Sequence, residues 1–117
     1  MNSDYIRELF ENDRRSLLKY YRAFLQELGE MTTELERAAA LRDYQTFRDA
    51  AHKTKTSLQL FKADRLREVL QMTREVYQNG DWTQLPELQQ ELLRELENTR
   101  AFLRDEMKVW EESNGPQ

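Results

Sequence analysis

The sequence predicts an all-α fold, an antiparallel up-down four-helix bundle with a short additional N-terminal helix. Apolar residues recur at intervals of three and four through most of the 117 residues, which is the spacing of helices that bury one face. Only three glycines and two prolines occur, too few for a turn-rich β fold. Since the connections between the predicted helices are short, neighbouring helices must run antiparallel.

The first two helices are expected over residues 3–10 and 13–41. Ile6 and Leu9 share one face of the first helix, and the second keeps its apolar rhythm to its end. Gly29 lies inside the second helix, where glycine costs about 1 kcal/mol relative to alanine. We therefore expect a kink or a close approach at this residue, with a tolerated interior glycine as the alternative.

Three further helices are expected over residues 43–61, 64–79 and 84–112. The segment around Gly80 is the clearest stop in the chain, because glycine ends helices and the aspartate after it can begin another. Pro86 must lie in the first turn of the last helix, where its missing N–H does no harm.

The composition indicates a single domain over residues 1–112 and a flexible tail over residues 113–117. The net charge of −4 argues against a nucleic-acid partner. The absence of cysteine excludes disulfides and is compatible with the cytoplasm. No apolar run approaches the roughly 20 residues of a membrane span, and the first residues do not resemble a signal peptide. We therefore expect a cytoplasmic protein without membrane insertion.

The only histidine, His52, falls on a polar face of the helix expected over residues 43–61. It shares that face with Arg48, Lys55, Thr56 and Gln59, whereas the core-facing stripe comprises Tyr44, Phe47, Ala51, Thr54, Leu58 and Phe61. An exposed imidazole titrates near neutrality and can act as a nucleophile. Neighbouring cations suit an anion attached to it.

Residues 51–57, Ala-His-Lys-Thr-Lys-Thr-Ser, resemble the motif of the histidine-containing phosphotransfer (HPt) domain. That motif is Ala-His-x-x-Lys followed by small residues, on an exposed face of a four-helix bundle. The resemblance covers roughly residues 5–110. It implies that His52 takes a phosphoryl group from a receiver-domain aspartate and passes it to another, and that Lys55 stabilises this group.

The implied partners are receiver domains of response regulators or of hybrid sensor kinases. The receiver would bring the Mg²⁺ and the carboxylates of a loose, in-line transfer, so the chain would need no cofactor and would not itself be an enzyme. Arg48 could assist the transfer, and Gln59 could orient the imidazole or touch the receiver. Thr56 and Lys62 occupy positions where the family often has glycine. The departure at Thr56 puts the choice of partner in question, and the departure at Lys62 puts the shape of the turn in question.

The second helix is expected to contribute to the docking surface. Counting outward from the turn near residue 42 places Leu28, Gly29, Met31 and Thr32 beside the histidine. We expect part of this segment to remain exposed as an apolar rim, because a receiver must exclude water around the transferring group.

Other kinds of site fit poorly. A di-metal carboxylate bundle needs two histidines, and no zinc ligand set or glycine-rich phosphate loop occurs, so we expect no metal. The alternative function is a helical adaptor that binds a partner protein through one bundle face, with His52 never phosphorylated. In either case we expect a monomer.

Overall fold

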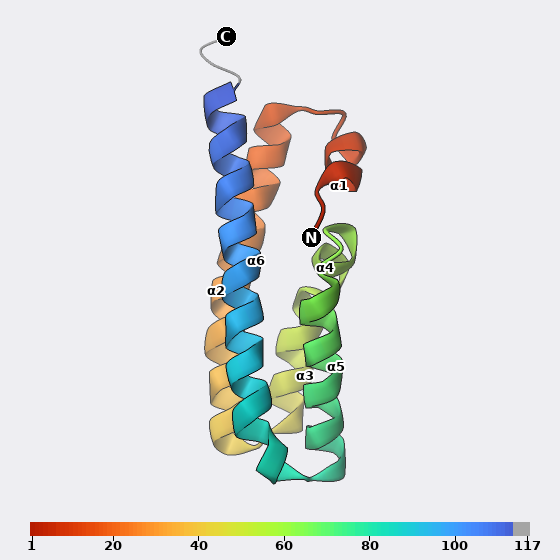
Figure 1. The fold of residues 1–117 in the computed structure, drawn as a ribbon, viewed down its shortest axis with the longest axis vertical. Helices are drawn as coiled ribbons and strands as arrows, with labels where there is room; N and C mark the ends of the chain where they lie inside the picture. Colours follow the sequence, from red (N-terminus) through yellow and green to blue (C-terminus); the bar gives the residue numbers. More distant parts are fainter. Residues whose placement is uncertain (114–117) are drawn as a thin grey trace.

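The computed structural model describes residues 1–113, and this part of the chain contains helices and no strand. The elements in order are α1 (Asp4–Leu9), α2 (Arg14–Leu41), α3 (Tyr44–Lys53), α4 (Lys55–Leu60), α5 (Asp64–Asn79), the 3₁₀ helix η1 (Trp82–Gln84) and α6 (Leu85–Ser113). The predicted all-helical class is therefore confirmed. The long helices lie side by side, and each runs opposite to the long helix before it (Figure 1).

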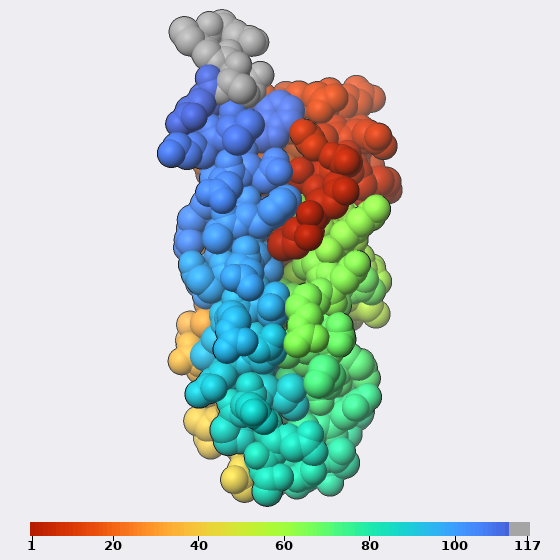
Figure 2. Space-filling model, in the orientation of Figure 1, coloured from red at the N-terminus to blue at the C-terminus, as the bar shows by residue number. Residues whose placement is uncertain are grey.

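The N-terminal segment closes one end of the molecule. The space-filling view shows it against α6 and against the segment around residue 60 (Figure 2). The backbone N–H of Asn2 donates to the carbonyl of Phe61 at 2.9 Å, and Ile6 is fully buried. Leu9, which we expected on the buried face with Ile6, is 54% exposed because it is the last residue of its short helix.

The helix boundaries follow the predicted turn residues closely. Asp43 caps α3 by accepting a hydrogen bond from the backbone N–H of Gln45 at 3.2 Å. Gly80 ends α5 with a φ of 75°, in the left-handed region that favours glycine. Pro86 is the second residue of α6, as expected. Ser113, expected in the tail, is the last residue of α6, and the rest of the predicted tail lies outside the described residues.

Aromatic side chains occupy much of the core. Phe61 stacks on Phe24 with ring centroids 5.3 Å apart, and its ring centroid is 5.5 Å from that of Tyr21. Phe47 stacks on Tyr77 at 4.8 Å. The Phe61 contacts join α2 to the end of α4, and the Phe47–Tyr77 stack holds α3, the helix that carries His52, against α5.

The helix expected over residues 43–61 is broken in two at Thr54. The side chain of Thr54 is buried, and its hydroxyl lies 3.4 Å from the carbonyl oxygen of Ala51 and 3.4 Å from the sulfur of Met31. The Thr54 backbone keeps right-handed helical angles at the break, with a φ of −101° and a ψ of 0°. His52 therefore lies in the last turn of α3 and not midway along one long helix.

The close approach expected at Gly29 is wrong for the described part of the chain. A Cβ atom built on Gly29 would meet nothing within 4 Å there, so the alternative of a tolerated interior glycine fits better. The apolar pattern expected to the end of the second helix fails at the last residue of α2, Leu41, which is 61% exposed. Among the described helices, none is sufficiently long and apolar for a membrane span.

Candidate functional site

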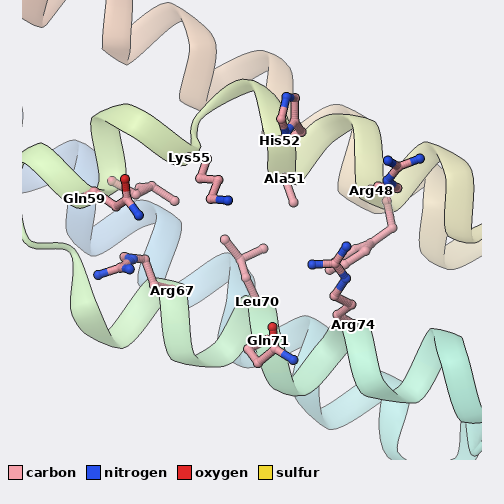
Figure 3. A pocket seen from close by; sticks show the side chains of 11 residues that line it. Arg48, Ala51, His52, Lys55, Gln59, Arg67, Leu70, Gln71 and Arg74 are labelled. Atoms are coloured by element: carbon pink, nitrogen blue, oxygen red, sulfur yellow. The ribbon is translucent and has the colours of Figure 1, made fainter.

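His52 is exposed and lies at the edge of a groove between α3 and α4 on one side and α5 on the other (Figure 3). The groove has a volume of about 380 Å³. It is lined by Phe47, Arg48, Ala51, His52, Lys55, Leu58, Gln59, Arg67, Leu70, Gln71 and Arg74. The structure thus joins the polar face of the histidine segment to a face of α5.

The groove combines an apolar floor with basic walls. Phe47, Leu58 and Leu70 are buried and form the floor. The walls carry three arginines and one lysine, and none of the lining residues is a carboxylate, although the chain as a whole has a net charge of −4. Positive charge is therefore concentrated around the only imidazole in the protein, where it would favour an anion.

Lys55 is the first residue of α4, just beyond the break at Thr54. Its ammonium group projects into the groove, whereas the ring of His52 points away from α5 at the upper edge (Figure 3). Because Thr54 interrupts the helix between them, the relative direction of the two side chains is set by this break and not by helical periodicity. Of the other predicted assisting residues, Arg48 and Gln59 also line the groove, and Thr56 is exposed outside its lining.

The residues from α5 were missed by the sequence analysis. Arg67, Gln71 and Arg74 recur at intervals of four and three, which places them on one face of a helix. This periodic polar stripe was available in the sequence. The sequence does not show that this stripe lies opposite His52, because that requires knowing which helices are neighbours in the bundle.

Arg74 also contacts Tyr44 across the groove. The Nε of Arg74 donates a hydrogen bond to the Tyr44 hydroxyl at 3.2 Å. This hydrogen bond is the main reason why the pKa of Tyr44 is lowered from its ordinary value, and the positive charge of Arg74 acts in the same direction. The pair links the start of α3 to α5 at one end of the groove.

The apolar rim expected on α2 is wrong for Leu28 and Met31, which are 0% and 3% exposed. Thr32 is half-buried and turned towards α6, since its hydroxyl accepts a hydrogen bond from Arg100 at 3.0 Å. The reason is that α2 packs against both α3 and α6, so its apolar residues enter the core. Gly29 is half-buried, and its suggested role in docking stays a prediction.

The described residues contain no group of three or more histidine, cysteine, aspartate or glutamate side chains arranged to hold a metal ion.

Comparison with known protein families gives one match. The model of the family described as the Hpt domain matches residues 19–102, more than two thirds of the chain and a range that includes every residue of the groove. A search of curated proteins and a search of solved structures found no match.

Proposed function

Since the chain belongs to the Hpt domain family, we propose that it is a phosphocarrier in which His52 accepts a phosphoryl group from one receiver-domain aspartate and passes it to another. Hpt domains take part in histidine phosphotransfer in phosphorelay signalling, and they interact with receiver domains and histidine kinases. They act as phosphocarriers rather than as catalysts. Interaction with these partners would place the chain in the cytoplasm. We expect it to act there as a monomer.

The observation that most supports this role is the exposed position of the only imidazole at the edge of a basic groove. A nucleophile that exchanges a group with a second protein has to be reachable, and His52 is. The product carries a dianionic phosphoryl group, which nearby cations stabilise. Both requirements are met at this place in the described part of the chain.

The transfer step exchanges one bond to phosphorus for another. The lone pair of the unprotonated ring nitrogen, which we assign to Nε2, attacks phosphorus while the P–O bond to the aspartyl carboxylate breaks. The carboxylate leaves with the bonding electron pair, and the N–H on the other ring nitrogen stays in place. The receiver supplies the metal ion and carboxylates for this loose, in-line transfer, so His52 needs only to be held and accessible. Lys55 then neutralises part of the charge on the phosphoryl oxygens.

The first prediction is that incubation with a phosphorylated receiver domain labels the intact protein with acid-labile, base-stable phosphate. His52→Gln should abolish the label because the chain has no other imidazole. The variant should keep the melting temperature of the parent, since His52 is exposed. A label that persists in His52→Gln would contradict the proposal, and binding without any label would favour the adaptor alternative.

A further inference from the structure

We propose that the groove beside His52 binds a small organic anion, and that this ligand competes with the phosphorylated imidazole for Lys55. The ligand is a carboxylate or a phosphate ester attached to an apolar body. Binding of this ligand is independent of phosphotransfer, whereas the competition for Lys55 rests on the proposed function.

Arg74 is held in a position that suits an acidic group. It is half-buried, and its Nε donates a hydrogen bond to the Tyr44 hydroxyl at 3.2 Å. Figure 3 shows the terminal nitrogens of the guanidinium turned towards the space above Leu70. Two parallel N–H donors fit a carboxylate or a phosphate in a bidentate pair. Because Tyr44 orders the guanidinium before any ligand arrives, the entropy lost on binding is smaller.

The opposite wall of the groove supplies a second cation. Lys55 is exposed on α4, and its ammonium group projects into the groove from the side facing α5 (Figure 3). Neither Lys55 nor Arg74 forms an ion pair with a carboxylate among residues 1–113, whereas Arg65 and Arg67, on the same helix as Arg74, both do. Two cations without a counter-ion on facing walls favour an anion between them.

The apolar floor of the groove favours an organic anion over an inorganic ion. Phe47, Leu58 and Leu70 are buried beneath the groove, and Ala51 is half-buried beside them. The volume of about 380 Å³ falls within the range of roughly 300–1,000 Å³ that is typical of small-molecule sites. None of the lining residues is a carboxylate that would repel an acid. A ligand with one acidic group and an aromatic or aliphatic body would contact both the cations and the floor.

The directions of two side chains connect this site to phosphotransfer. The ring of His52 points away from α5, whereas Lys55 projects into the groove (Figure 3). Lys55 can therefore stabilise a phosphoryl group on His52 only when its flexible stem turns out of the groove. A bound anion would hold the ammonium group inside the groove. The ligand should then shorten the lifetime of phosphohistidine.

Binding is tested by titrating the ¹⁵N-labelled full-length chain with phenylpropionate and, separately, with phenyl phosphate. We expect saturable chemical-shift changes at the amides of Lys55, Leu70 and Arg74. The two titrations distinguish a carboxylate site from a phosphate site, and saturation by either probe supports the proposal. Inorganic phosphate lacks the apolar body and should bind roughly tenfold more weakly or worse. Equal affinity for inorganic phosphate, or no saturation by either organic probe, would overturn the proposal.

Variants test whether the two cations hold the ligand. Arg74→Gln and Lys55→Gln should each lower the association constant roughly tenfold. Since Lys55 is exposed, its variant keeps the test decisive if Arg74→Gln fails to fold. The matched control is Arg104→Gln, which removes the same charge at an exposed site outside the groove and should bind like the parent. An equal loss in this control would show that only net charge matters and would overturn the proposal.

The competition is tested on the phosphorylated chain with the tighter-binding of the two organic probes. At saturation, the probe should shorten the lifetime of phosphohistidine in the parent, by up to the roughly tenfold effect of one charge-assisted hydrogen bond. In Lys55→Ala the same concentration of probe should have no effect on the lifetime. An unchanged lifetime in the parent would overturn the competition for Lys55.

The anion site and the phosphocarrier role can fail separately. If a probe saturates the groove and His52 is not phosphorylated, the anion site stands, and the phosphocarrier role falls together with the competition. If His52 is phosphorylated and neither organic probe saturates the groove, the anion site falls and the phosphocarrier role stands.

Discussion

Lys55 extends its ammonium group into the groove beside His52 and is exposed (Figure 3). If it stabilises the phosphorylated imidazole, Lys55→Ala should shorten the lifetime of phosphohistidine or slow its formation by roughly tenfold, the size of one charge-assisted hydrogen bond. The measurement is loss of labelled phosphate over time in the isolated, phosphorylated protein. The midpoint of chemical unfolding should not change.

Lys53 provides the matched control for this experiment. It is exposed and close in sequence, but it is not among the residues that line the groove. Lys53→Ala removes the same charge and should leave the lifetime unchanged. Equal effects in both variants would mean that Lys55 acts only through the general field of the protein and has no specific contact with the phosphoryl group.

Single residues of the site differ in how far the sequence could predict them. Arg48 and His52 both lie on α3, so local periodicity was sufficient to group these two. Lys55 lies on α4, beyond the break at Thr54, and it still lines the same groove. Met31 shows where that reasoning ends. Counting from the turn gives its height along the bundle, and Met31 does contact Thr54, two residues after His52. Counting does not give the direction of a side chain, and Met31 points into the core.

At the scale of the helices, the spacing of apolar residues does not change at the break at Thr54. Phe47, Leu58 and Phe61 are buried on both sides of the break, so the same spacing fits one helix or two. Glycine and proline usually mark an interruption of a helix, and neither residue occurs near Thr54. A threonine bonded to the preceding turn does not mark the break either, because Thr73 and Thr99 make such bonds within the uninterrupted helices α5 and α6.

The connection between α4 and α5 carries a measurable strain at Lys62. Its φ of 54° lies in the left-handed region, which costs a residue with a side chain roughly 1 kcal/mol relative to glycine. Lys62→Gly should therefore raise the free energy of unfolding by up to about 1 kcal/mol, as measured by denaturant titration. Lys62 is exposed and outside the groove, so phosphotransfer should not change.

Gly80 offers the opposite substitution in the connection that follows α5. Its φ is 75°, and a Cβ there would meet only the Trp82 ring nitrogen at 4.0 Å, so backbone strain and not crowding decides the outcome. Gly80→Ala should lower stability by about 1 kcal/mol. The Lys62 prediction has its own contradicting outcome. If Lys62→Gly lowered the stability, the flexibility of glycine in the unfolded chain would outweigh the relief of strain at Lys62.

For the whole molecule, the all-helical class was predictable because amphipathic spacing and the scarcity of glycine and proline point the same way. The groove was not predictable, since it arises only when α3, α4 and α5 are placed side by side. Its basic character is a property of the assembly of helices. In the sequence, Arg67 and Arg74 are typical surface residues of an amphipathic helix. Only the fold places α5, and with it these two residues, opposite His52.

The stability of the whole bundle should respond to alkaline pH through Tyr77. This residue is 6% exposed, its hydroxyl has no hydrogen-bond partner among the described residues, and burial raises its pKa to about 12. In the unfolded chain the phenol titrates near its ordinary pKa of about 10. The folded state thus keeps a proton that the unfolded state loses, so the stability is fully present below pH of about 10 and declines as the pH rises towards 12.

Tyr77→Phe should flatten this decline, because phenylalanine keeps the stack on Phe47 without a group that ionises. At neutral pH the variant should be as stable as the parent or more stable by about 1 kcal/mol, since it removes a buried hydroxyl without a partner. Denaturant midpoints at intervals from neutral pH to pH of about 11 measure both effects, and Tyr5→Phe at an exposed site is the control. Burial also raises the pKa of Tyr21, so some alkaline sensitivity should remain in the variant. A pH profile identical to that of the parent would show that Tyr77 ionises as readily in the folded protein as in the unfolded chain.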